Sequence, residues 1–298
     1  MWYSGQPMRP LFTSLFASAL ALGLVSASLV GCETPAPRAA LSYTADAKRA
    51  YDEAMNEFNA HNWIEAQELF RTVKRKYSYS KYARLAELRI ADADFELEKF
   101  TEAIRGYRQF VHDHRSDPDE VAYARARIAE SQYKQINDTF LLPSADERDQ
   151  AVVLDAFKEL KGYLHDYPST KESEKIRELL TDVTARLMRH ELYVARFYLR
   201  VDNFDAAVLR VHYAMRNFAG SAAATKSPGP AGAGAELIDS GLEAEALLLL
   251  GEVYLKMHKF GEARDAFNSI VRDYPRSPLV LQANNYLAYM KERVDSVP

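Results

Sequence analysis

The chain of 298 residues has only one cysteine, Cys32, and few of the patterns that catalytic sites need. A single cysteine excludes an intramolecular disulfide and a cysteine-based metal cluster. The seven histidines show no metal-binding spacing such as His-Glu-x-x-His, and the glycines at 229–234 lack the Lys-Ser/Thr pair that completes a phosphate-binding loop. A Gly-x-Ser-x-Gly hydrolase elbow is also missing. The sequence therefore predicts a protein that is not an enzyme, with no metal site and no cofactor.

The chain also lacks a strong excess of charge of either sign. Its 38 basic and 42 acidic residues give a formal net charge of -4, so no broad positive field attracts nucleic acid. A local exception is a basic cluster, formed by Arg71, Lys74, Arg75, Lys76, Lys81 and Arg84. This cluster is either a solvated face or a contact for an acidic partner or for lipid headgroups.

One long apolar run, from Leu11 to Val30, follows Arg9 and is typical of a bacterial secretory signal. A membrane-spanning helix is the alternative, because about 20 apolar residues span a bilayer. The run ends in Leu29-Val30-Gly31-Cys32, which resembles a lipobox, the cleavage and lipidation site of bacterial lipoproteins. The resemblance implies that residues 1–31 are a signal peptide and that Cys32 carries covalent lipid. Because residue 33 is Glu and not Asp, the same resemblance favours the outer membrane over the inner one.

The segment after Cys32 contains Pro35, Pro37 and several alanines and has little apolar surface to bury. We therefore expect residues 32–43 to form a flexible lipidated tether. Helical periodicity begins near Thr44 and continues almost to the end of the chain, so residues 44–298 form the folded body.

The folded body repeats one unit, which is clearest from Leu247 to Pro275. An apolar residue recurs every three or four positions on two consecutive segments, which predicts two helices that a turn near His258–Phe260 separates. The spacing Leu-Gly-x2-Tyr, Ala-x3-Phe and a later Pro is that of a tetratricopeptide repeat. Small residues at Gly251 and Ala263 allow the two helices to approach closely.

Four further copies begin their second helix with the same pattern. The form aromatic-x-x-Ala recurs at Trp63–Ala66, Phe100–Ala103 and Phe204–Ala207, and a weaker copy begins at Val153–Ala156. Turns such as Tyr167-Pro-Ser-Thr stop one helix and cap the next. One such unit cannot bury its apolar stripe alone, so we predict an all-α solenoid of about five helical hairpins with a C-terminal capping helix.

Two segments interrupt the array. Residues 137–148 are longer than a repeat turn needs and include Phe140-Leu141-Leu142, so they either contact a partner or fold back over the array. Residues 219–240 are rich in Ala, Gly, Ser and Pro, which predicts a disordered insertion between the fourth and fifth repeats.

The third and fourth repeats carry a more specific pattern. It comprises Asp146-x-Arg148-Asp149, Leu160…Tyr163…Tyr167-Pro168-Ser169, Glu191-Leu-Tyr193, and Phe204-x-Ala206-x-Val208-x-Arg210-Val211. In this combination the chain resembles the BamD family, the lipoprotein subunit of the bacterial outer-membrane β-barrel assembly machine. The family has five such repeats behind a lipobox, so the resemblance covers nearly the whole mature chain. The sequence departs from the family pattern at Ala219, where the turn usually has Pro, and in the 219–240 insertion.

The resemblance implies a scaffold on the periplasmic face of the outer membrane of a Gram-negative bacterium, held there by its lipid. It implies binding to the POTRA region of BamA, to other lipoproteins of the machine, and to unfolded outer-membrane protein clients. Arg210 matches a family arginine that contacts the POTRA domain. Clients would bind the groove of the first repeats, where Tyr51, Tyr82 and Phe95 are candidate contacts; core packing is the alternative role of Phe95.

Other functions remain open from the residues alone. A periplasmic repeat adaptor such as the Tol-Pal coordinator has similar turns, although such an adaptor carries no lipid. A pilotin of a secretin is a third possibility. Copurification with a secretin instead of a POTRA protein would favour the pilotin.

Overall fold

The computed structural model describes residues 36–136, 144–219 and 242–295, and in these residues it contains helices and no strand. The helices are α2 (Ala36–Asn59), α3 (Trp63–Lys76), α4 (Lys81–Glu96), α5 (Phe100–Asp113), α6 (Pro118–Lys134), the 3-10 helix η1 (Ala145–Glu147), α7 (Ala151–Asp166), α8 (Ser173–Arg200), α9 (Phe204–Phe218), α10 (Leu242–Lys256), α11 (Phe260–Asp273) and α12 (Val280–Asp295).

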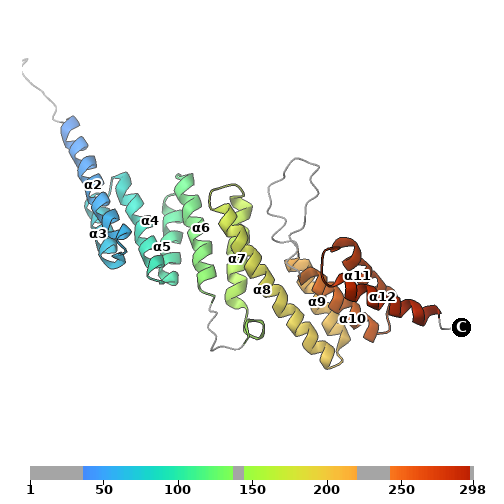
Figure 1. The fold of residues 1–298 in the computed structure, drawn as a ribbon. Helices are drawn as coiled ribbons and strands as arrows, with labels where there is room; N and C mark the ends of the chain where they lie inside the picture. Colours follow the sequence, from blue (N-terminus) through green and yellow to red (C-terminus); the bar gives the residue numbers. More distant parts are fainter. Residues whose placement is uncertain (1–35, 137–143, 220–241, 296–298) are drawn as a thin grey trace, which may run out of the picture.

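Consecutive helices form five hairpins that stack side by side into an elongated array, with α12 at its end (Figure 1). Each helix contacts the helix before it and the helix after it, and some first helices also meet, as α2 meets α4 and α8 meets α10. The predicted helical solenoid with a capping helix is confirmed. α8, with 28 residues, is the longest of the described helices.

Four of the hairpins turn through the same backbone motif. His61, Glu98, Asp202 and His258 each have a positive φ, between 55° and 62°. In each turn the next residue donates its backbone N–H to the carbonyl five positions earlier, as Lys99 does to Asp94 at 2.8 Å. This Schellman arrangement closes the first helix, and the aromatic residue that follows opens the second. The third hairpin lacks the motif because the longer segment 135–150 joins α6 to α7.

The turns between hairpins follow the predicted stop-and-start pattern. α3 ends at Lys76, and the next residue, Tyr77, has a buried side chain. Ser80 then caps α4 by accepting a hydrogen bond from the backbone N–H of Tyr82 at 3.2 Å. Capping of this kind satisfies a backbone donor that the first turn of a helix leaves unpaired.

The core consists of four clusters of buried side chains along the array, and each cluster joins neighbouring helices. In the last cluster, Gly251 of α10 faces the fully buried ring of Phe267 on α11, and that ring stacks on Tyr286 of α12. The close approach predicted at Gly251 is therefore present, and it seats an aromatic ring against helix backbone.

The first helix begins earlier than expected. α2 starts at Ala36, so residues 36–43 of the predicted tether are helical, and only residues 32–35 of it lie outside the described residues. Tyr43 packs edge-on against Tyr77 at 5.4 Å, and a helix anchored by such packing extends backward at little cost. Pro37 is compatible with this because a helix tolerates proline in its first turn.

The two predicted insertions lie almost wholly outside the described residues. Only Ala219 of the 219–240 insertion is described, as the residue that ends α9. Of the 137–148 segment, residues 144–148 are described, and they pack back onto α8: His190 Nδ1 lies 2.8 Å from the carbonyl oxygen of Asp146.

Candidate partner-binding surfaces

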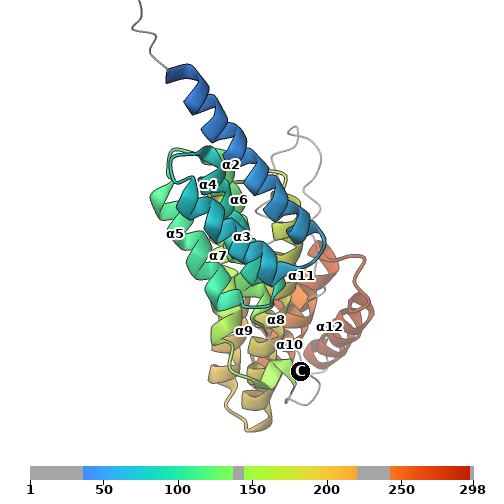
Figure 2. The ribbon, with the colours of Figure 1, turned by 90° about the vertical axis from the view of Figure 1, so that its left-hand side faces the viewer.

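The predicted client residues lie on the first helices of the first two hairpins. Tyr51 of α2 and Tyr82 of α4 pack together with their ring centroids 5.6 Å apart, and Tyr51 also meets the buried ring of Phe70 at 5.5 Å. Both tyrosines are half-buried, so each presents part of its ring to solvent. Figure 2 shows these helices at the end of the array where α2 projects. The structure thus brings these two candidates together.

Phe95 has a different environment. Its ring packs edge-on against Phe100 at 5.4 Å and borders the second core cluster. The guanidinium of Arg127 lies over the ring, 3.7 Å from its centroid. Because a cation already covers one ring face, Phe95 is less available to a client than Tyr51 and Tyr82 are.

A buried polar network, which the sequence did not indicate, links these helices. Asp92 of α4 is 1% exposed and accepts hydrogen bonds from the hydroxyls of Tyr107 and Tyr123, the latter at 2.9 Å. Arg89 and Arg127 also pair with this carboxylate. Four side chains therefore converge on Asp92 from α4, α5 and α6, which compensates its removal from water.

The network continues in both directions across the array. Toward the N-terminus, Arg89 Nε donates to the hydroxyl of Tyr51 at 3.4 Å, which reaches α2. Toward the C-terminus, Arg127 pairs with Glu130 at 3.0 Å, and Lys175 of α8 pairs with the same carboxylate at 2.9 Å. A chain of charged and hydroxyl groups thus joins the first helices of four hairpins and holds their spacing.

Burial and charge set the protonation of this network. Burial raises the pKa of Tyr107 well above its ordinary value, and the Asp92 carboxylate raises it further. The pKa of Tyr123 is raised for the same two reasons. Burial works against the charge of Arg127, but contacts with Tyr107, Tyr123 and Asp92 outweigh it, so the pKa of Arg127 is raised overall. The tyrosines therefore stay neutral and the arginines charged at physiological pH.

Arg210, the residue that the family resemblance assigns to a partner contact, lies on α9. Its Nη1 donates to Oε2 of Glu191 on α8 at 3.1 Å, while 43% of the side chain stays exposed. Leu209 is 65% exposed, and Tyr213, one helical turn after Arg210, is 41% exposed. Arg210 is thus held by Glu191 through one nitrogen, is partly exposed, and has two exposed apolar residues near it in the sequence of α9.

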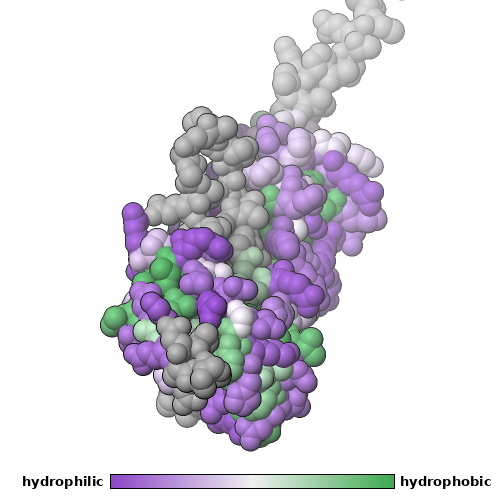
Figure 3. All heavy atoms as spheres, turned by 90° about the vertical axis from the view of Figure 1, so that its right-hand side faces the viewer, coloured by the Kyte–Doolittle hydropathy of each residue, from purple (hydrophilic) through white to green (hydrophobic). Residues whose placement is uncertain are grey.

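Exposed apolar side chains are concentrated in this half of the molecule. Among the described residues, seven of the ten large hydrophobic side chains that are exposed lie between Phe197 and Tyr289. Figure 3, which views the array from the side of α12, shows several such side chains among hydrophilic ones. Near the end of the array a cavity of about 440 Å³ is lined by Leu199, Glu252, Leu255, Lys256, His258, Phe260, Tyr286 and Tyr289.

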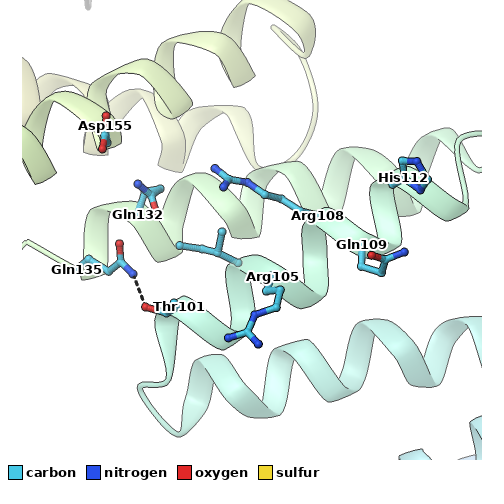
Figure 4. Close-up of a pocket in the computed structure, with 9 residues that line it drawn as sticks. Thr101, Arg105, Arg108, Gln109, His112, Gln132, Gln135 and Asp155 are labelled. Atoms are coloured by element: carbon cyan, nitrogen blue, oxygen red, sulfur yellow. Dashed lines mark hydrogen bonds between the residues drawn. The ribbon is translucent and has the colours of Figure 1, made fainter.

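A second cavity, of about 690 Å³, lies between α5, α6 and α7 (Figure 4). It is lined by Thr101, Ile104, Arg105, Arg108, Gln109, His112, Gln132, Gln135 and Asp155. Gln135 closes one side by donating to Thr101 Oγ1 at 3.1 Å, and Arg108 pairs with Glu159 at 2.6 Å. Eight of the nine lining residues have polar or charged side chains, and none of the nine is a residue predicted to bind a partner.

The part of the chain that the structure describes holds no group of three His, Cys, Asp or Glu side chains placed to bind a metal. Among the same residues, no helix combines the length and the apolar character that crossing a membrane requires. Cys32 lies outside the described residues.

A family model described as an outer membrane lipoprotein, YfiO, matches residues 44–227, more than half of the chain. The chain belongs to the YfiO family. A tetratricopeptide-repeat model matches residues 245–277, which are the fifth hairpin and the unit that is clearest in the sequence. The predicted resemblance to a family of outer-membrane lipoproteins is therefore confirmed for the first four hairpins, and the repeat for the fifth.

Relatives of this YfiO-family chain include outer membrane protein assembly factor BamD of Caulobacter vibrioides, 28% identical over 204 residues, or 68% of this chain and 64% of that protein. The chain therefore spans slightly less than two thirds of that relative. The protein of the same name from Neisseria gonorrhoeae is 22% identical over 267 residues, which cover 89% of this chain and 92% of that one. The crystal structure of a thermophilic TPR protein from Thermus thermophilus aligns with 82% of this chain and 98% of its own, at 14% identity and a TM-score of 0.34.

Proposed function

We propose that this chain is a lipid-anchored scaffold of the outer-membrane β-barrel assembly machine, as its relatives named BamD are assembly factors. The observation that carries the proposal is the family match over residues 44–227, together with the sequence Leu29-Val30-Gly31-Cys32, which resembles a lipobox. In this proposal residues 1–31 are removed, Cys32 carries the lipid, and the array stands on the periplasmic face of the outer membrane. Lipid chains on one residue hold a protein at a bilayer without a spanning helix.

The POTRA region of BamA binds, in this proposal, at the surface around Arg210. The side chain supports this because it is half-exposed, oriented by Glu191, and flanked by the exposed Leu209 and Tyr213. A guanidinium surrounded by apolar side chains is a common centre of a protein interface, and it can hold a partner carboxylate through two parallel hydrogen bonds.

Unfolded outer-membrane proteins bind at the first-helix surface around Tyr51 and Tyr82. The half-buried rings offer apolar area with a polar edge, and the network through Arg89 and Asp92 fixes the spacing of the helices that carry them. An extended segment with alternating aromatic side chains could lie on such a surface. Phe95 is a secondary contact, because Arg127 covers one face of its ring.

The deciding experiment is a pull-down of the lipidated chain from detergent-solubilised outer membranes, with partners identified by mass. We expect the wild-type chain to capture a POTRA-bearing barrel and Arg210→Glu to lose it. Arg216→Glu is the matched control, because it makes the same charge change on the same helix six residues away, on another side of the helix. Arg210→Gln keeps a donor for Glu191 while removing the charge, so it tests binding in a chain whose fold is preserved.

The other outcomes also decide between hypotheses. Capture by wild type and by both Arg210 variants keeps the assembly function and moves the interface elsewhere. Capture of a secretin, and of no POTRA protein, would make the chain a pilotin and refute the proposal. The mass of the intact chain from membranes tests the anchor separately: a chain that retains residues 1–31 without added lipid would contradict lipidation at Cys32.

A further inference from the structure

The first turn between hairpins carries an unusual concentration of positive charge. It joins the end of α3 to the start of α4. Between Glu68 and Glu87 the chain has six basic residues, those of the basic cluster, and no acidic residue. The structure gathers these residues around residues 77–80, at one edge of the array.

Three members of the cluster are already paired. Lys74 lies 3.1 Å from Glu87, Arg84 lies 3.1 Å from Asp117, and Arg71 pairs with Glu68 on its own helix. Arg75, Lys76 and Lys81 are exposed and form no ion pair within the described ranges. Lys76 and Lys81 instead lie 5.3 Å from the ring centroids of Tyr77 and Tyr82, so aromatic rings support their positions and leave the charges free.

The turn also presents an aromatic side chain to solvent. Tyr79, between these cations, is 97% exposed, the largest exposed fraction among the large hydrophobic side chains of the described residues. In water, an exposed tyrosine ring has no apolar neighbour to pack against. At the headgroup level of a bilayer, the ring can contact lipid while the hydroxyl stays hydrated.

The next two turns between hairpins do not share this charge. The second turn has Arg115 among Asp113, Asp117, Asp119 and Glu120. In the third turn Lys171 is paired with Glu172 at 3.4 Å. The excess of unpaired positive charge therefore distinguishes the first turn from the second and third turns.

The first turn is also the one beside the N-terminal end of the folded chain. Tyr43 of α2 contacts Tyr77, and α2 extends seven residues further, to Ala36, about 10 Å at the rise of an α-helix. The four further residues to Cys32 span at most about 14 Å. The turn thus lies within about 25 Å of the residue that carries the lipid under the function proposed above.

We propose that Arg75, Lys76, Tyr79 and Lys81, here called the first-turn surface, bind the surface of an anionic phospholipid bilayer. The location of this contact rests on the proposed lipid at Cys32, but the binding itself does not need it. The three cations meet lipid phosphates and the Tyr79 ring enters the headgroup layer. Lipid and first-turn surface together give two points of attachment, which set the orientation of the array on the membrane.

The expected affinity follows from the number of free cations. Each Lys or Arg near an anionic bilayer strengthens binding about 5-fold, so three contribute on the order of 100-fold at low ionic strength. The contribution falls as salt rises, because the Debye length shortens to about 8 Å at physiological ionic strength.

The test uses the chain from Glu33 onward, without lipid, which retains every described helix and all four core clusters. Its flotation is measured with vesicles of phosphatidylcholine alone and of phosphatidylcholine with phosphatidylglycerol. We expect binding only to the anionic vesicles, weakened by salt and reduced about 100-fold in Arg75→Gln/Lys76→Gln/Lys81→Gln. Lys256→Gln/Lys259→Gln/Arg264→Gln removes the same charge at the opposite edge of the array and should bind as wild type does.

A fluorescent reporter tests the tyrosine. In Trp63→Phe/Tyr79→Trp, the indole at position 79 is the only one in the chain from Glu33, and its emission should shift to the blue on anionic vesicles. An unshifted emission on bound vesicles would overturn the role of Tyr79.

Three results would overturn the proposal as a whole. These are no binding of the unmodified chain to anionic vesicles, equal loss in both triple variants, and a photo-crosslinker at position 79 that captures a protein in cells instead of lipid. The last would assign the first-turn surface to an acidic polypeptide. Because the chain tested carries no lipid, failure here leaves lipidation at Cys32 and POTRA binding standing, and their failure leaves this test valid.

Discussion

Replacing Gly251 with alanine should destabilise the fifth hairpin, although alanine is the better helix former. A Cβ atom at this position would lie 2.5 Å from Cε1 and Cζ of Phe267 and 3.0 Å from its Cδ1. The ring cannot move aside easily, because it is fully buried and stacks on Tyr286 with a centroid separation of 4.8 Å. The added methyl group must therefore push α10 and α11 apart or tilt two rings.

Two effects of opposite sign decide the outcome. Alanine in place of glycine in a helix interior raises the free energy of unfolding by about 1 kcal/mol. Overpacking of a well-filled core costs about 1–3 kcal/mol, and a contact at this distance with a ring backed by a second ring belongs at the upper end. The net loss is about 2 kcal/mol, which lowers the melting temperature of a chain of this size by about 5 °C.

The assay is thermal and urea unfolding of the chain from Glu33, followed by circular dichroism, with amide hydrogen exchange of α10 and α11 as the local measurement. Local exchange matters because a repeat array need not unfold in one step. Gly162→Ala is the matched control: it lies within α7, and a Cβ atom there meets nothing within 4 Å. The free energy of unfolding of this variant should rise by about 1 kcal/mol.

A stability that falls in Gly251→Ala and rises in Gly162→Ala would support the close approach at Gly251. A second substitution tests whether the ring of Phe267 is what the added methyl group meets. Phe267→Leu should cost less in the presence of Gly251→Ala than in its absence, because the smaller side chain makes room for the methyl group. If both alanine variants stabilise the chain, the packing of Phe267 is not what requires glycine at position 251, and the reasoning fails.

Three other predictions concern the network and the turns. Asp92→Ala should cost about 3–5 kcal/mol in urea unfolding because it leaves two partly buried arginines without their shared carboxylate; a loss below about 1 kcal/mol would show that the network contributes little. Since folding raises the pKa of Tyr107 and Tyr123, stability should be complete below about pH 10 and decline as pH rises toward the folded values, and Tyr107→Phe should reduce that decline in melting curves taken against pH. Glu98→Gly, at a φ of 59°, should raise the melting temperature by an amount equivalent to about 1 kcal/mol, and a decrease would contradict strain at that turn.

Much of the fold could be predicted because a helical hairpin is a local structure. The apolar period, the aromatic-x-x-Ala start and the Tyr-Pro-Ser turns all act within about 35 residues, the length of one repeat. A close approach of the two helices at Gly251 was predicted on this basis, and the structure shows that approach, with the ring of Phe267 facing Gly251. The beginning of α2 could not be predicted in this way, because packing of Tyr43 on Tyr77, not composition, holds that end of the helix.

The candidate binding surfaces likewise include features that the sequence predicts and features that only the fold reveals. Arg210 could be singled out because it matches a family arginine within a short motif of the fourth repeat, and its partly exposed position suits the proposed role. The covering of Phe95 by Arg127 could not, since the two residues are 32 positions apart and belong to different hairpins. The proposed lipid contact of the basic cluster also needed the fold, because only the fold shows which cations are paired and that the Tyr79 side chain is exposed.

The sequence by itself thus determined the class of fold, the number of hairpins and the family, because these depend on short local patterns and on how often they recur along the chain. Only the tertiary structure decided how the repeats are joined. Asp92 is the clearest case: its partners Tyr107, Tyr123 and Arg127 lie 15 to 35 positions away on two other helices. A buried charge is stable only when such partners surround it, and stacking of the hairpins is what brings them together.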